Sequence, residues 1–268
     1  MKYCLKPTTL LLFIISAQFL FAQNFNLEPE ESESNIIGLK VGIPNFKNDD
    51  YITYSSFSGC YTPYALIGLK KNWSLYAEIP IIVAKDDYDN QVGPGNIFVS
   101  LRKNLNETKT SRISFGGYIP IIGKEKYLIQ EIGLFSNTYR FSQVARAFTI
   151  YGNYAYHAPG TENLIFGVEA GPDVFIPIEE GDMELLLHFG AKAGYKLNNL
   201  WLWSEINNIM IVTESNMDFG DRLISQLVFG GQLKFNKVKP GVFYTFPLKD
   251  YMKEVQNGII GLKLDINI

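Results

Sequence analysis

The chain has 268 residues with 24 Lys and Arg, 27 Asp and Glu and a formal net charge of −3, and no stretch gathers the basic residues that nucleic-acid binding requires. Its two cysteines are Cys4, which lies in the leader described next, and Cys60, so neither an intrachain disulfide nor a cysteine-based metal site is expected in the exported chain. We therefore predict no cofactor, no metal and no nucleic-acid partner. Aromatic residues are abundant instead, with 16 Tyr and 19 Phe.

The first residues have the anatomy of a secretory signal. Two lysines precede an apolar run at 10–21, and the small residue Ala22 follows it at a suitable cleavage point. The alternative, a membrane-spanning helix, needs about 20 consecutive apolar residues, but Ser16 and Gln18 interrupt this short run. We predict that residues 1–22 are a cleaved signal peptide of a Gram-negative cell.

Beyond the leader, side chains alternate between apolar and polar with a period of two residues. In the last segment, residues 257–268, the even positions include Ile260, Leu262, Leu264, Ile266 and Ile268, and the odd positions include Gly261, Lys263, Asp265 and Asn267. The same division recurs at 164–176 and 184–195. Successive side chains of a strand point to opposite faces, so this alternation predicts strands with one apolar face.

Twelve segments of this kind follow one another along the chain. They are residues 35–44, 57–70, 73–84, 95–103, 111–122, 142–157, 163–177, 183–196, 200–213, 222–235, 239–249 and 257–268. Most reach the roughly 9–11 residues that a tilted strand needs to cross a bilayer. Short turns, such as 70–73 and 196–200, alternate with longer polar loops, such as 85–95 and 213–221, as in bacterial outer-membrane proteins.

The pattern predicts an all-β fold: a transmembrane up-and-down antiparallel β-barrel of about 12 strands, within a range of about 10–14. The barrel would occupy residues 35–268, after an N-terminal tail at 23–34. A soluble β-sandwich also has alternating strands, but here nearly every strand presents an aliphatic stripe opposite a face of glycine and charge. The predicted location is the cell outer membrane, with outer-membrane lipid as a partner. The C-terminal strand partly matches the signal that the barrel-assembly machinery recognises, so that machinery is a second predicted partner.

One connection is too apolar for a solvated loop. Residues 122–141 lie between two predicted strands and contain the run Tyr127–Ile132, in which most residues are apolar. A thirteenth strand at 131–140 would break the parity that the other segments share. Two explanations stay open: the loop folds into the barrel mouth, or the strand count is wrong.

Part of the chain resembles a known family. An aromatic-led segment, Trp73-Ser-Leu-Tyr-Ala-Glu-Ile-Pro80, is followed by a loop with Gly93-Pro94-Gly95 and by the strand Asn96-Ile-Phe-Val-Ser-Leu-Arg102. This succession resembles the transporter-like outer-membrane barrels named after the meta-pathway of phenol degradation, although Asn96 stands where those proteins usually have Asp. The resemblance implies an outer-membrane barrel with a transport role, and it brings no catalytic residues.

Inward-facing charged and polar residues are the candidates for a functional site. Glu169, Asp173, Glu184, His188, Lys192 and Glu205 cluster on three consecutive predicted strands. In an open pore these residues would line a constriction that selects solutes by charge. In a filled barrel, residues of both signs would pair with one another across the strands, and a barrel of this size allows either arrangement.

Aromatic residues near the strand ends are predicted at the membrane–water interface. They are Trp73, Tyr195, Trp201 and Trp203. Aromatic side chains at that depth form the girdles of membrane barrels, because one end of the ring system is apolar and the other tolerates water.

The predicted function is passage or facilitated uptake of small solutes, hydrophobic ones included, through the outer membrane; the solute itself is unknown. The alternative is a structural or adhesive barrel with a filled interior. A membrane-embedded lipid-modifying enzyme ranks third. Acyl transfer by a serine needs a histidine within hydrogen-bond reach, and the two histidines, His157 and His188, both fall on inward faces, away from lipid. We therefore predict no catalytic residues.

Overall fold

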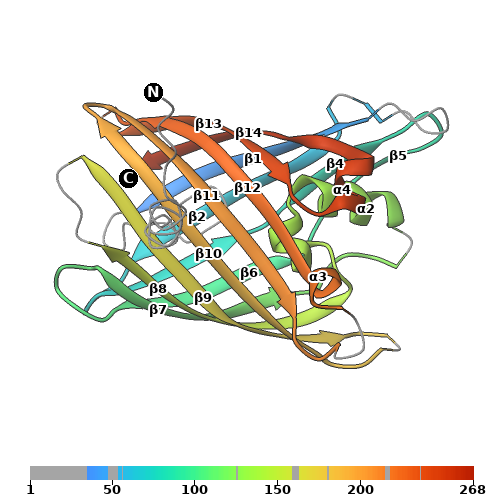
Figure 1. Cartoon of the computed structure of the whole chain (residues 1–268), viewed down its shortest axis with the longest axis horizontal. Coiled ribbons are helices and arrows are strands. Elements are labelled where there is room, and N and C mark those ends of the chain that lie inside the picture. The colour runs from blue at the N-terminus through green and yellow to red at the C-terminus, as the bar shows by residue number, and fades with distance from the viewer. Residues whose placement is uncertain are drawn as a thin grey trace, which may run out of the picture.

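The computed structural model describes residues 35–47, 54–55, 57–124, 126–158, 163–179, 181–214, 218–235 and 237–268. The predicted signal peptide (1–22) and tail (23–34) lie outside the described residues. One antiparallel sheet of 14 strands accounts for most of the described chain. This sheet closes on itself because β1 (Ile36–Phe46) pairs both with β14 (Gln256–Asn267) and with β2 (Gly59–Gly68) (Figure 1).

Of the strands described, 12 make the closed barrel wall, and the other two, β4 (Ile81–Lys85) and β5 (Asn90–Pro94), form an added hairpin. Between β2 and β14 the wall consists of β3 (Trp73–Glu78), β6 (Ile97–Asn104), β7 (Ser111–Ile119), β8 (Ala147–Ala158), β9 (Leu164–Pro177), β10 (Glu184–Leu197), β11 (Leu200–Ile211), β12 (Leu223–Leu233) and β13 (Val238–Pro247). Each wall strand pairs with the wall strand before it and the one after it. The predicted fold class, an up-and-down antiparallel barrel of about 12 strands, is confirmed.

The predicted strand at 73–84 is split in the structure. Strand β3 ends at Glu78 and β4 begins at Ile81, so the break falls at Ile79-Pro80. Proline has no N–H for the ladder, and the Pro80 carbonyl accepts a hydrogen bond from the Gly95 amide at 2.8 Å. After this break β4 pairs with β5 and with the first residues of β2.

Short turns and long loops lie at opposite ends of the barrel. The turns between β2 and β3, β10 and β11, and β12 and β13 share one end with the C-terminus, which we call the turn end (Figure 1). The other end, called the loop end, carries α2 (Tyr127–Ser136), the 3-10 helix η1 (Thr138–Gln143), α3 (Phe219–Arg222) and α4 (Asp250–Val255). In bacterial outer-membrane barrels, the end with short turns faces the periplasm. No helix in the described ranges is long and apolar enough to cross a bilayer.

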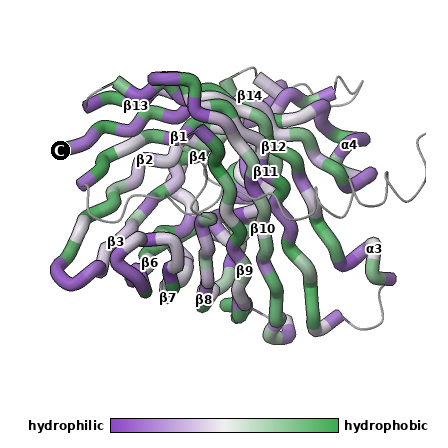
Figure 2. Tube along the Cα trace, turned by 60° about the vertical axis from the view of Figure 1, so that its left-hand side comes forward, coloured by the Kyte–Doolittle hydropathy of each residue, from purple (hydrophilic) through white to green (hydrophobic). Residues whose placement is uncertain are grey.

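The two faces of each wall strand differ in polarity. In β14, Leu262 is 52% exposed whereas its neighbour Lys263 is 7% exposed, and in β7 Phe115 is exposed while Ser114 is buried. Figure 2 shows hydrophobic and hydrophilic residues alternating along the strand tubes. An apolar outer face over a polar interior is the arrangement that a surrounding bilayer requires.

We expect Leu262→Arg to destabilise the protein in liposomes, with a free energy of unfolding lower by about 2–4 kcal/mol. The reason is that the substitution places a charge on the lipid-facing side of β14 near the strand centre. The measurement is reversible denaturant unfolding followed by tryptophan fluorescence. Leu262→Ala is the control, since it removes the side chain without adding charge. Equal losses for the two variants would contradict a lipid-facing position.

Candidate functional site: the plug and the loop-end cavity

The apolar connection between β7 and β8 folds into the barrel. Its described residues, 122–124 and 126–144, are called the plug, and they include α2 and η1. Helix α2 contacts β1, β2, β4, β5 and β14, whereas η1 contacts β11 and β12, so the plug crosses the lumen from one wall to the opposite wall. The first of the two explanations for this loop is therefore correct, and the segment 131–140 is helical in the structure, with no strand.

An apolar face holds α2 against the wall. Leu128, Ile129 and Ile132 are at most 1% exposed, and they pack with Ile82 and Ala84 of β4. Positions three and four residues apart share one face of a helix, which is why these side chains form a single buried stripe. Burial of each such side chain contributes about 1.5–3 kcal/mol, so the cluster fixes α2 firmly to the β4 side of the barrel.

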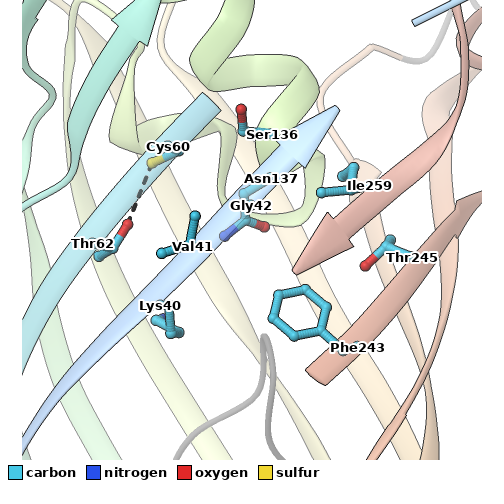
Figure 3. A pocket seen from close by; sticks show the side chains of 10 residues that line it. All are labelled: Lys40, Val41, Gly42, Cys60, Thr62, Ser136, Asn137, Phe243, Thr245 and Ile259. Atoms are coloured by element: carbon cyan, nitrogen blue, oxygen red, sulfur yellow. Dashed lines mark hydrogen bonds between the residues drawn. The ribbon is translucent and has the colours of Figure 1, made fainter. Parts of the chain in front are cut away.

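The end of α2 fits tightly against β1. Figure 3 shows Ser136 and Asn137 beside Gly42, with Cys60 and Thr62 of β2 close by. A Cβ atom at Gly42 would lie 2.8 Å from the Ser136 carbonyl oxygen, so only glycine allows this approach. The cavity left here measures about 20 Å³, little more than one water molecule occupies.

One buried amide, that of Asn96, fastens both ends of the plug. Its Nδ2 donates to the Ser142 carbonyl at 2.8 Å and to the Ala145 carbonyl, and its Oδ1 accepts from the Ile121 and Ile122 amides at 3.1 and 3.4 Å. Asn96 is fully buried, so each of these bonds replaces one that water would otherwise supply. An ionised aspartate accepts hydrogen bonds but cannot donate them, so Asp at this position could not make the bonds to the Ser142 and Ala145 carbonyls.

A buried carboxylate ties the middle of the plug to the wall. Glu78 of β3 accepts from Arg140 of η1, with an Nη1–Oε1 distance of 2.9 Å, and from Lys40 of β1, with an Nζ–Oε2 distance of 3.0 Å. The Tyr76 hydroxyl also donates to Glu78. Removal of one member of such a buried set leaves its partners charged and without compensation, which costs about 3–5 kcal/mol.

The structure brings five of the six predicted site residues together on the inner faces of β9, β10 and β11, and two of them, Glu169 and His188, contact Tyr139 of η1. Glu169, His188, Lys192 and Glu205 are each at most 4% exposed, and Asp173 is partly buried. Lys192 stands directly opposite Glu205 in the register of β10 and β11. We call these five residues the polar layer.

Histidine 188 has both ring nitrogens engaged within the polar layer. Nδ1 lies 2.9 Å from Asp173 Oδ2, and Nε2 lies 3.2 Å from Asn153 Oδ1. The Tyr151 ring stacks on the imidazole at 4.7 Å, and the Tyr139 hydroxyl of the plug donates to Glu169 at 3.4 Å. With these contacts, no ring nitrogen of His188 is left to activate a serine.

The sixth predicted residue, Glu184, lies apart from the polar layer, at the loop end. It borders a cavity of about 480 Å³ between the plug and the wall strands β9 to β12. The cavity is lined by Leu134, Phe141, Phe175, Glu184, Leu186, Ile209, Ile211, Glu214, Ile224 and Tyr251. The plug therefore fits closely against β1 and leaves space on the opposite side, above the polar layer.

The prediction for the interface aromatics is wrong for two of the four residues. Trp203 is 7% exposed and packs against Val228 inside the barrel, and Trp201 shares its inner face, with the Lys196 and Lys234 ammonium groups 4.4 and 2.9 Å from its ring centroid. Odd positions of β11 point inward, which the proximity to a strand end does not reveal. Trp73 and Tyr195 lie on the outer face at the turn end, and their place at the membrane boundary stays a prediction.

Metal-binding clusters are absent from the described ranges, since no three His, Cys, Asp or Glu side chains there are placed to hold an ion.

Comparison with solved structures shows which fold this is. The chain is similar to an outer membrane channel from Pseudomonas putida F1 (TM-score 0.59, 11% identity, 92% of this chain and 100% of that chain). It is also similar to the translocator domain of autotransporter NalP from Neisseria meningitidis (0.57, 11%, 98% and 98%) and to the NanC porin (0.52, 9%, 87% and 98%). The chain has an outer-membrane β-barrel fold. No protein-family model and no curated protein sequence matches it.

We expect Asn96→Asp to destabilise the plug by about 1–3 kcal/mol, because it removes two donors and places a carboxylate oxygen against two carbonyl groups. Hydrogen exchange followed by mass spectrometry should show faster exchange over residues 121–145, with β10 to β12 unchanged. Asn90→Asp, on the exposed strand β5, is the matched control. Unchanged exchange in the plug would refute the role assigned to Asn96.

Proposed function

We propose that this protein is an outer-membrane channel or facilitator for small, largely apolar solutes that enter from the loop end. The observation that carries the proposal is the cavity of about 480 Å³ between the plug and β9 to β12. Its size falls in the range of about 300–1,000 Å³ that is usual for small-molecule sites, and most of its lining residues are apolar or aromatic. The resemblance to the meta-pathway family also supports a transport role.

The position of the cavity supports a route through the barrel. It lies above the polar layer, on the side of the lumen that the plug leaves free. A solute bound in the cavity would next meet Glu169, His188 and Lys192, which we propose as the constriction. Passage from an apolar site through a narrow polar layer requires a weakly bound solute, because a tightly held one would not leave.

A second candidate function, a filled barrel that serves as a scaffold for its loops, has its own support. The plug crosses the lumen, and the inward carboxylates of Glu78, Asp173 and Asp265 each have a positively charged or imidazole partner within 3.0 Å. Charges that are compensated in this way can stay inside a closed interior, and they need no solute.

The two candidates differ in what happens when the cavity is filled. We expect cells that display the protein to take up the neutral fluorescent probe 1-N-phenylnaphthylamine several-fold faster than cells without it. Ile209→Trp places a larger side chain in the cavity and should return the rate to the level of cells without the protein. Ile206→Trp, on the lipid-facing side of the same strand, is the control and should leave uptake unchanged. Equal uptake with and without the protein would overturn the proposed function and favour the scaffold.

Single-channel recording tests the proposed route for ions. We expect discrete openings in planar bilayers, and Glu184→Lys should shift the selectivity towards anions because Glu184 lies at the entrance to the route. Glu107→Lys, in the turn between β6 and β7, is the control at the other end of the barrel. If the channel opens but its ion selectivity is the same in the wild type and in Glu184→Lys, the ion path does not pass Glu184.

A further inference from the structure

We propose that the loop-end cavity selects organic cations with an apolar body, such as quaternary ammonium compounds and protonated aromatic amines. This inference rests on the proposed function, because it specifies which small solutes the same cavity admits. It is carried by the charge and by the aromatic content of the lining.

The charged residues of the lining are both acidic. Among the described residues that border the cavity, only Glu184 and Glu214 carry a formal charge. Glu184 begins β10, and Glu214 follows the end of β11, so the two carboxylates come from neighbouring strand ends. Two negative charges beside an apolar cavity attract a cation and repel an anion, and the low polarity of the walls strengthens both effects.

Neither carboxylate forms an ion pair with a basic side chain in the part of the chain that the structure describes. The Glu184 carboxylate accepts a hydrogen bond from the Thr213 hydroxyl, which leaves its charge in place. Within the described ranges, no Lys, Arg or His forms an ion pair with Glu184 or Glu214. The nearby lysines of the loop end are engaged elsewhere, since Lys249 pairs with Asp221 and Lys253 with Asp250, each at 2.9 Å.

Aromatic rings complete the site. Phe141 of η1 and Phe175 of β9 lie with ring centroids 5.6 Å apart, and Tyr251 of α4 lines the same cavity. The face of an aromatic ring attracts a cation whose charge is spread over alkyl groups, and sites for quaternary ammonium ligands combine such rings with acidic residues. A small metal cation would instead require several oxygen ligands around it, which this apolar lining does not supply.

The combination favours an organic cation over other solute classes. A carboxylate or phosphate compound would meet two like charges without a basic partner. A sugar would leave its hydroxyl groups without hydrogen bonds against Leu186, Ile209 and Ile224, at a cost of about 1–3 kcal/mol for each. A neutral hydrocarbon fits the walls but gains nothing from Glu184 and Glu214. An apolar body that carries one positive charge uses both features of the cavity.

The test compares a cation with a neutral compound of related shape. Binding of benzyltrimethylammonium and of benzyl alcohol is measured by saturation-transfer NMR on the full protein in lipid nanodiscs, with empty nanodiscs as the blank. We expect the wild-type protein to prefer the cation. The double variant E184Q/E214Q keeps the shape of the lining and should weaken cation binding by about tenfold or more, with benzyl alcohol unchanged. Added salt should weaken cation binding to the wild type, because part of the attraction is screened.

The controls distinguish failure of charge selection from failure of the proposed function. Glu254→Gln, on the exposed side of α4, removes a negative charge outside the cavity and should leave binding unchanged. Equal cation binding by the wild type and by E184Q/E214Q, with both compounds lost in Ile209→Trp, would overturn charge selection and keep the cavity as the entry site. No binding of either compound to the wild type, together with no effect of the protein on probe uptake, would overturn the proposed function itself.

Discussion

The closure of the sheet between β1 and β14 is the constraint on which the rest of the structure depends. A bilayer core offers no water to an unpaired backbone N–H or C=O group, so a membrane-spanning sheet has to pair its last strand with its first. The register runs without interruption from Ile36↔Asn267 to Asn45↔Gly258, and a single bulge follows at Phe46. Closure with twelve wall strands fixes the width of the lumen, and that width leaves room for the plug between the wall side chains.

The plug fills the lumen unevenly. On the β1 and β4 side it packs as a protein core does, with Ile82 and Ile132 inaccessible to solvent. On the β9 to β12 side it leaves the loop-end cavity. The difference follows from chemistry along the plug. The apolar stripe of α2 packs against β4. In η1, by contrast, Tyr139 bonds to Glu169 of β9 and Arg140 bonds to Glu78 of β3. Apolar burial holds α2, whereas a few polar contacts hold η1. The plug leaves the loop-end cavity on the side where its contacts with the wall are few.

The sequence predicts the wall well and the interior poorly, for physical reasons. Alternation with a period of two is set by each strand alone, so all twelve wall strands could be located, and the Ile79-Pro80 break is the main departure. The Glu78–Arg140 pair joins residues 62 positions apart, and no local pattern specifies which inward charge a loop arginine will meet. The apolar run at 127–132 did signal burial, but its helical form could not be separated from a short strand. Trp201 and Trp203 show the opposite failure, because a position near a strand end suggests the membrane boundary, whereas their parity with the inward-facing Glu205 points them into the barrel.

Asn96 has a consequence for how this barrel can change. Because a single side chain bonds to 121 and 122 on one side and to 142 and 145 on the other, the intervening segment enters and leaves the wall at fixed points. A loop fastened at its base can alter its length and composition without disturbing the ladders on either side. The wall and the plug are thereby separated into two modules. A chain that keeps the anchor can exchange the insert while the same scaffold goes on folding in the membrane.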